Sequence, residues 1–287
     1  MLGRELVRQL HELKQCRLAT CWGSSELDIK DREDVATKLG RLKPTIVLNA
    51  AAYTDVDGCE RNQELAHAVN AAGPAHLAEA CRQIGAIVVH FSTDFIFDGT
   101  ACRPYQPQDS ANPISVYGHS KWNGEEAIRQ ACVDHLIIRT SWLFGPGGRN
   151  FVDTILARAE TGQPLRVVTD QVGRPTFSSD LAEAVLALLD ARARGVVHFA
   201  NADSCSWFEF AVEIVRQAGL STIVEPITSD QLDRPARRPA YSVLDTEGYT
   251  KITGRSIASW RDALRRYMRF RRPVDGCRAL VSEARCP

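Results

Sequence analysis

The stretch Ala86-Ile-Val-Val-His-Phe-Ser-Thr-Asp94 decides the fold class of this chain. Its apolar run from Ala86 to Phe91 is typical of a parallel strand buried on both faces, and polar residues follow it at once. Comparable runs alternate with amphipathic patterns, so we expect strands at 45–48, 135–139 and 196–199 and helices at 32–42, 64–84, 117–131 and 179–192. This alternation predicts an α/β fold, a Rossmann-like doubly wound parallel sheet covered by helices on both faces.

The pattern becomes mixed after the turn cluster Gly145-Pro146-Gly147-Gly148. We expect helices at 151–160, 207–218 and 257–268 and a strand at 165–169. Because no linker separates these elements from the first part, we expect a smaller lobe that interleaves with the sheet. The predicted organisation is a nucleotide-cofactor-binding domain over 1–145, with segments near 165–200 and 225–250 returning to it, a mainly substrate-binding lobe over 146–270, and a flexible tail over 271–287.

Composition excludes some classes of partner. The 287 residues are 44% hydrophobic, and 35 basic side chains balance 35 acidic ones. A surface for nucleic acid or membrane built on bulk positive charge is therefore not expected. No apolar stretch approaches the roughly 20 residues of a membrane span, and no signal peptide is evident. We expect a cytoplasmic protein whose scattered cysteines are reduced.

Tyr117 and Lys121 carry the chemical prediction. If the segment is helical, the phenol and the ammonium project from one face about one turn apart. A free phenol titrates near ~10, and a neighbouring cation favours the phenolate, so we expect Lys121 to lower the pKa of Tyr117. With a neutral hydroxyl from Thr93 to hold a carbonyl oxygen, the three side chains predict carbonyl reduction or its reverse.

Three polar motifs come directly after predicted strands, where ligands bind to an open parallel sheet. They are Asn49-Ala50-Ala51-Ala52-Tyr53-Thr54, Phe91-Ser92-Thr93-Asp94 and Arg139-Thr140-Ser141-Trp142. The alanines leave room for a flat cofactor against the backbone, and Thr54, Thr93 and Asp94 offer polar contacts. Their joint placement with Tyr117 and Lys121 predicts a single site at this edge of the sheet.

In this order the motifs resemble the dTDP-4-dehydrorhamnose reductases, a family of the extended short-chain dehydrogenase/reductase superfamily. The most specific further matches are Ser92 to Gly99, Arg139 to Gly145, Asn150-Phe151-Val152, Asp170 to Thr176, Arg238-Pro239 and Ser242 to Asp245. The resemblance runs from Gly3 to about Met268. It implies hydride transfer from a nicotinamide to the 4-keto group of dTDP-4-dehydro-6-deoxy-L-mannose, which yields dTDP-L-rhamnose for polysaccharide synthesis.

The resemblance also implies roles for individual residues. Tyr117 would donate the proton, Lys121 would tune it and hold the nicotinamide ribose, and Thr93 would orient the sugar. Asp94 and Trp142 would line the sugar pocket, with Val56 and Phe95 as weaker candidates. On the cofactor side the matching positions are Leu2 and Gly3 at the remnant of a glycine-rich turn, Asp28 and Ile29 near adenine, and Ala52, Tyr53, Thr54 and Phe91 near the nicotinamide.

Cofactor choice is predicted from the residues after the strand expected at Cys16 to Trp22. No Asp or Glu comes directly after it to bond a ribose 2′-hydroxyl, so NADPH is favoured and NADH remains usable. Some relatives carry Mg²⁺ at a homodimer interface. The resemblance therefore implies that this chain could form a homodimer and could bind Mg²⁺. We nevertheless expect no metal site, and we expect Glu5 to be a surface helix glutamate.

The start of the chain departs from the family pattern. Leu6, Leu10 and Leu13 recur at helical spacing directly behind Gly3, so the chain is expected to begin inside a helix. Roughly ten residues that hold the first strand and most of the glycine-rich turn are then missing. Either translation starts upstream of Met1 or the truncation is genuine and catalysis has been lost. The presence of all three catalytic side chains favours the first explanation.

Two other functions compete with ketone reduction. Nucleotide-sugar dehydratases of the superfamily generally place a glutamate after the Thr-Asp pair, where this chain has Phe95. A non-catalytic nucleotide-binding subunit, resembling the regulatory β subunit of methionine adenosyltransferase, is the main alternative. Thr93, Tyr117 and Lys121 argue against it. His90 is expected to be a packed strand histidine, and Trp207 and Trp260 are expected to anchor helices.

Overall fold

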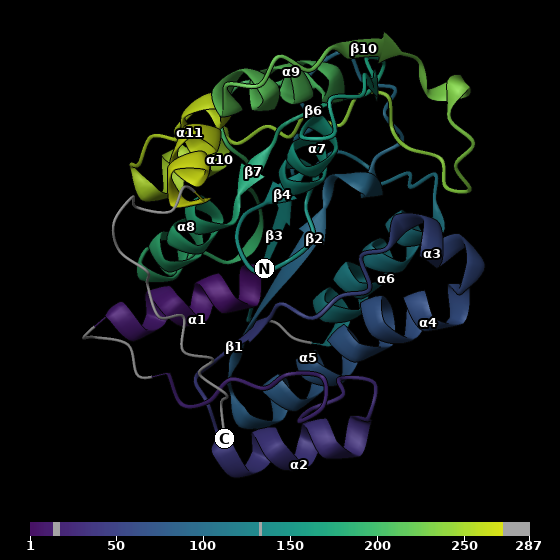
Figure 1. The fold of residues 1–287 in the computed structure, drawn as a ribbon. Coiled ribbons are helices and arrows are strands. Elements are labelled where there is room, and N and C mark those ends of the chain that lie inside the picture. Colours follow the sequence, from purple (N-terminus) through teal and green to yellow (C-terminus); the bar gives the residue numbers. More distant parts are fainter. Residues whose placement is uncertain (14–17, 132–133, 272–287) are drawn as a thin grey trace.

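The computed structural model describes residues 1–13, 18–131 and 134–271. Its central element is a four-stranded parallel sheet in the order β1-β2-β3-β8 (Figure 1). The strands are β1 (Ile46–Asn49), β2 (Ile87–Thr93), β3 (His135–Thr140) and β8 (Gly195–His198). The predicted parallel sheet is confirmed. The tail expected after Arg271 lies outside the described residues.

Helices cover both faces of this sheet, because successive side chains along a strand point to opposite sides. Val88 and Ile137 pack with α2 (Arg32–Leu42), α5 (Gly73–Ile84) and α6 (Val116–Ala131). Val89 and Leu136 pack on the other face with α1 (Leu2–Glu12) and α8 (Ser178–Asp190). The doubly wound arrangement expected from the continuous apolar strands is therefore confirmed.

The helix expected at 64–84 forms with a local change of winding. It is built from α4 (Gln63–His67), a π-helical turn at Ala68–Ala72, and α5, which follow one another without a break. A short helix that was not expected, α3 (Val56–Arg61), precedes it. Asp55 caps α3 by accepting a hydrogen bond from the Gly58 N–H, which explains how so short a segment remains helical.

A second hydrophobic core lies above the carboxyl end of the sheet (Figure 1). It is built from α7 (Phe151–Ala159), α9 (Trp207–Ala218) and α11 (Trp260–Arg271), together with β5 (Leu165–Val168), which pairs in parallel with β10 (Val224–Ile227). The remaining elements are short: β4 (Leu143–Phe144), β6 (Val172–Gly173), β7 (Thr176–Phe177), β9 (Cys205–Ser206), α10 (Glu247–Thr253) and the 3₁₀ turns Asp94–Ile96 and Ser229–Gln231.

One of the expected strands does not form. Of the segments near 165–200 and 225–250, β8 joins the main sheet, whereas β5 and β10 pair with each other beside the second core, and the assignment of these segments to the cofactor-binding domain stays a prediction. Residues 18–22 of the expected strand at 16–22 form no strand. An extended segment needs a neighbour for its backbone hydrogen bonds, and β1 pairs only with β2 among the described strands. The division of the chain at residue 145 stays a prediction.

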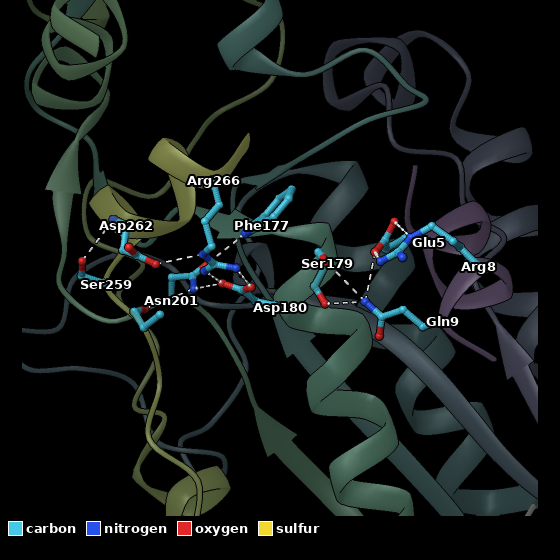
Figure 2. Close-up of polar contacts among 11 residues, drawn as sticks. Glu5, Arg8, Gln9, Phe177, Ser179, Asp180, Asn201, Ser259, Asp262 and Arg266 are labelled. Carbon is cyan, nitrogen blue, oxygen red and sulfur yellow. Dashed lines mark hydrogen bonds and ion pairs between the residues drawn. The ribbon is translucent and has the colours of Figure 1, made fainter. Parts of the chain in front are cut away.

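Glu5 is also placed differently from the expectation. Its side chain is buried between α1 and α8, where Gln9 Nε2 donates to Glu5 Oε1 at 3.0 Å and also to Ser179 Oγ at 3.2 Å (Figure 2). Arg8 neutralises the carboxylate from the solvent side. Position 5 belongs to the face of α1 that lies on α8, so Glu5 is buried although its side chain is charged. In the same view Asp180 binds Arg266 of α11, so α8 is tied to both of its neighbours.

No helix in the described parts of the chain combines the length and the apolar character needed to cross a membrane.

We expect the buried pair of Arg139 and Glu125 to be a sensitive point of this fold. Arg139 Nη2 lies 2.8 Å from Glu125 Oε2, and both side chains are almost fully buried. Glu125→Gln leaves the guanidinium without its counter-charge, so it should lower the free energy of unfolding by about 3–5 kcal/mol. The matched change Glu126→Gln on the exposed side of α6 should stay within about 0.5 kcal/mol. Urea unfolding of both variants checks this, and equal effects would contradict it.

Candidate functional site

Two glycines let α6 approach its neighbours closely, Gly118 at the turn after β2 and Gly124 at the π-helical turn Ala68–Ala72. A Cβ on Gly118 would lie 2.2 Å from the Phe95 carbonyl oxygen, and one on Gly124 would lie 2.1 Å from the Asn70 carbonyl oxygen. Real Cβ atoms do not approach so closely, so only glycine allows this contact at either position. Since Tyr117 precedes Gly118, the close approach places the phenol beside Thr93 at the carboxyl end of β2.

Thr93 and Tyr117 are neighbours in the structure. The Thr93 hydroxyl is close enough to the Tyr117 phenol to lower its pKa. Thr93 Oγ1 in turn donates to Asp94 Oδ1 at 3.0 Å, and it accepts a hydrogen bond from the Phe95 N–H. The Phe95 ring stands edge-on to the Tyr117 ring, with 5.6 Å between centroids. The Phe95 ring therefore helps to fix the phenol in place.

The predicted effect of Lys121 on the phenol is wrong for this structure. Burial of the hydroxyl raises the pKa of Tyr117, and the nearby Asp94 carboxylate raises it further, while the Thr93 hydroxyl lowers it only in part. The Lys121 nitrogen instead donates to the Phe91 carbonyl at 2.6 Å and lies 3.1 Å from His90 Nε2. Burial lowers the pKa of Lys121 to about 8, against the attraction of Glu125. Desolvation is the largest cause of the shift at Tyr117, and the Lys121 amine faces His90 and the backbone of β2.

Asp94 holds other residues instead of facing a cavity. Its side chain is 1% exposed, and Ser242 Oγ donates to its second oxygen at 2.5 Å. Burial raises the pKa of Asp94 to about 6, although both hydroxyl contacts lower it. In the structure the Asp94 carboxylate is a supporting contact that orients the Thr93 hydroxyl, and the expectation that Asp94 lines the sugar pocket stays a prediction.

The Asn-Ala-Ala-Ala-Tyr-Thr motif forms an exposed ledge at the end of β1. Ala52 and Thr54 are exposed, and Tyr53 and Val56 are half-buried. Asn70 holds this ledge in place, because its side chain accepts from the Tyr53 N–H at 2.8 Å and donates to the Tyr53 carbonyl at 2.9 Å. Asn70 also donates to Ser120 Oγ on α6, so the ledge and the Tyr117 helix share one buried amide.

The remaining cofactor candidates are more scattered. Gly3, in the first turn of α1, stands against the ledge, with Ala50 Cβ 3.6 Å from an added Cβ. Leu2 and Phe91 turn their side chains into the core under α1 and α8. Ile29 is packed against Gly73 of α5, and Asp28 is an exposed loop residue beside Lys30. Among these cofactor candidates, Leu2, Phe91 and Ile29 have their side chains in the hydrophobic core.

Trp142 occupies a strained turn above the site. Its φ of 47° lies in the left-handed region, which a bulky residue rarely adopts. Its ring stacks on Trp207 with 3.6 Å between centroids, and the ring also covers Gly173. Trp207, expected only to anchor α9, is therefore also the partner of Trp142. Trp260 is fully buried in the second core, as its expected role requires.

Comparison with known proteins identifies the family. Residues 1–271 match the family described as RmlD substrate binding domain. The chain belongs to this family. It is 42% identical over 270 residues to the spore coat polysaccharide biosynthesis protein SpsK of Bacillus subtilis, covering 94% of each chain. It is 39% identical to a dTDP-4-dehydrorhamnose reductase of Streptomyces griseus, covering 97% of this chain and 95% of the relative.

A solved structure of a family member is also closely similar. The dTDP-4-dehydrorhamnose reductase of Bacillus anthracis, determined in complex with NADP, superimposes with a TM-score of 0.89 at 33% identity. The match covers 94% of this chain and 95% of that one. The resemblance drawn from the sequence motifs is thus confirmed, and so is the membership of an NADP-using group of oxidoreductases.

The RmlD motifs contain supporting residues that sequence reasoning did not assign. Asn49 and His90 lie within strand motifs, and Ser242 lies within a late motif, but the sequence predicted no contact for any of them. Asn70 carried no prediction at all. Its only signal is a polar residue amid alanines on a helix face that packs inward. Among the described residues, no group of three or more His, Cys, Asp or Glu side chains could hold a metal ion.

We expect Gly118→Ala to destabilise the protein. The new methyl group meets the Phe95 carbonyl oxygen, and neither α6 nor the turn after β2 can yield without breaking the Thr93 contacts. Overpacking of this kind costs about 1–3 kcal/mol of unfolding free energy. Gly248→Ala, at an open position in α10, is the control and should be neutral or stabilising by up to about 1 kcal/mol. Matching losses in the two variants, measured by urea unfolding, would show that the close approach is not limiting.

The raised pKa of Asp94 predicts a pH dependence of stability. A carboxyl that titrates at about 6 when folded and near 3.8 when unfolded stabilises the fold below pH 3.8, and this contribution is lost as the pH rises through 6. We compare unfolding free energies of the natural chain and Asp94→Asn between about pH 4 and pH 7. The natural chain should lose about 3 kcal/mol relative to the variant across this window. A difference that does not change with pH would contradict the assignment.

Proposed function

We propose that this chain reduces the 4-keto group of dTDP-4-dehydro-6-deoxy-L-mannose with NADPH, giving dTDP-L-rhamnose. The observation that carries the proposal is the placement of Thr93 at the end of β2 beside Tyr117 in the first turn of α6, with Phe95 joined to both. Two neighbouring hydroxyls can both donate hydrogen bonds to one carbonyl oxygen. The names of the relatives that share these motifs support the choice of substrate.

The chain's own residues account for the proton in this reaction. The raised pKa of Tyr117 keeps the phenol protonated at neutral pH, which is the form that a proton donor to a ketone must have. Thr93 holds the carbonyl oxygen beside the phenol, and Asp94 fixes the direction of the Thr93 hydroxyl. The hydride for the carbonyl carbon would come from NADPH when it is bound. Tyr117 gives its proton to the oxygen, so the ketone leaves as an alcohol.

The exposed ledge of Ala50 to Ala52 fits a flat dinucleotide. Its side chains are small, and it stands against the first turn of α1, where Gly3 permits close contact and Arg4 is exposed. A helix N-terminus with a nearby cation favours the negative charge of a diphosphate. Tyr53 and Thr54 border the ledge, and Lys121 lies beneath it and would bind ribose hydroxyls. We therefore place the cofactor across this ledge.

The sugar is proposed to lie between Tyr117 and the second core. Phe95 and Val56 flank the phenol's side of this space, and Trp142 with Trp207 provides an aromatic surface above it. Use of NADH besides NADPH, a homodimer, a cytoplasmic location and a role for Mg²⁺ stay predictions. The non-catalytic subunit gains no support from the geometry, because Thr93 and Tyr117 are neighbours and Lys121 lies one turn further along the helix that carries Tyr117.

We expect Tyr117→Phe to lower kcat by about 10²- to 10⁴-fold, because the proton donor is lost. The affinity for NADPH should be nearly unchanged. The control is Tyr249→Phe, the same chemical change in the core under α10, which should retain full turnover. NADPH oxidation with the dTDP-4-keto sugar measures turnover, and fluorescence titration measures cofactor binding. Failure of the natural chain to oxidise either NADPH or NADH with this sugar would overturn the proposed function.

A further inference from the structure

The late motif that begins at Ser242 plays no part in the proposed mechanism, although its first residue reaches the site. The Ser242 N–H donates to the Val172 carbonyl of β6 at 2.8 Å. One residue further on, the Val243 carbonyl accepts from the Tyr105 N–H at 2.8 Å. The backbone of this segment is therefore held from both sides, which fixes where the Ser242 side chain projects.

The Ser242 side chain meets the carboxylate of Asp94. It is 2% exposed, and its Oγ lies 2.5 Å from Asp94 Oδ2. Thr93 Oγ1 lies 3.0 Å from the other oxygen, Asp94 Oδ1. An ionised carboxylate only accepts hydrogen bonds, so both hydroxyls donate to it. Two hydroxyls from distant parts of the chain thus share one buried carboxylate, one on each oxygen.

Thr93 cannot keep this hydrogen bond while it donates to a ketone. A hydroxyl has a single proton, and a ketone oxygen can only accept. Thr93 must therefore turn its proton from Asp94 Oδ1 to the substrate when Thr93 and Tyr117 both donate to one carbonyl oxygen. The Phe95 N–H still donates to Thr93 Oγ1 and keeps that oxygen atom in place.

The Asp94 carboxylate then needs another donor. Its side chain is 1% exposed, so water does not replace the hydrogen bond that Thr93 gives up, and a buried charge without hydrogen bonds is costly. Besides the two hydroxyls, backbone N–H groups of Asp94 and Phe95 lower the pKa of this carboxyl. The titratable neighbour Tyr117 has a raised pKa and brings no positive charge. Ser242 is therefore a side-chain donor that remains on the carboxylate after Thr93 has turned.

We propose that Ser242 is a positioning residue, which holds the Asp94 carboxylate so that the Thr93 hydroxyl can turn from Asp94 to the ketone oxygen of the substrate. The consequence for catalysis rests on the proposed reductase function. The hydrogen bond from Ser242 to Asp94 is a property of the protein alone and can be measured without turnover.

The first test follows the titration of Asp94 by the ¹³Cγ shift of its carboxyl, assigned with Asp94→Asn. Ser242→Ala removes a donor to the ionised form, so the pKa of Asp94 should rise by about one unit. Ser242→Cys keeps the shape with a weaker donor and should give a smaller rise. The control is Ser229→Ala, which removes a similar contact to the exposed Asp170 and should leave the Asp94 titration unchanged.

Identical Asp94 titration in the natural chain and Ser242→Ala would overturn the proposal. If Ser242→Ala does not fold, Ser242→Cys decides by the same comparison.

The second test measures turnover at about pH 8, where the Asp94 carboxyl is mostly ionised in both chains. Ser242→Ala should lower kcat/KM for the dTDP-4-keto sugar about 10-fold, because the hydrogen bond that it removes is to a charged group. The Kd for NADPH should be nearly unchanged, which a general loss of structure would not allow. Ser229→Ala should behave like the natural chain. Unchanged kcat/KM in Ser242→Ala would overturn the positioning role.

These outcomes separate this inference from the proposed function. The expected shift of the Asp94 titration in a chain that oxidises no NADPH would support the hold of Ser242 on Asp94 and overturn only the reductase proposal. Turnover by the natural chain together with natural kcat/KM in Ser242→Ala would do the reverse.

Discussion

The close approach of α6 to the end of β2 is the constraint on which the site depends. Gly118 and Gly124 remove the side chains that would keep the helix away from the Phe95 and Asn70 carbonyls. Because of that approach, Tyr117 reaches Thr93 and Lys121 reaches the backbone of β2. Asn70 then joins the same helix to the ledge after β1. One helix position thus sets the geometry of both the proton donor and the cofactor ledge.

Burial decides the electrostatics of this site. Lys121, Asp94, Tyr117 and His90 all have pKa values shifted toward their neutral forms, and desolvation is the largest cause for each. Removing a charge from water costs more here than the nearby partners return. Arg139 and Glu125, also buried, form an ion pair that is joined by more than one hydrogen bond. Burial therefore shifts the reactive groups toward their neutral forms, whereas the structural pair is held by direct contact between opposite charges.

Much of the fold could be predicted, because the spacing of apolar residues along the chain indicates buried strands and amphipathic helices. The limits of α2, α6 and α9 agree with the expected ranges to within one residue. The errors fall where pairing decides the outcome. Residues 18–22 have the composition of a strand but form none, and β10 (Val224–Ile227), for which no strand was expected, pairs with β5. Glutamate is usually found at the surface, but α8 covers the side chain of Glu5.

By itself, the sequence determined which residues could do the chemistry: a phenol and an amine one helical turn apart, and a threonine at a strand end. It also determined the family, through the late motifs around Asp170 and Arg238. Only the tertiary structure decided the direction of each pKa shift, the partner of Lys121 and the supporting role of Asp94. These depend on burial and on contacts between residues far apart in the chain, such as Asp94 with Ser242, which local spacing does not encode.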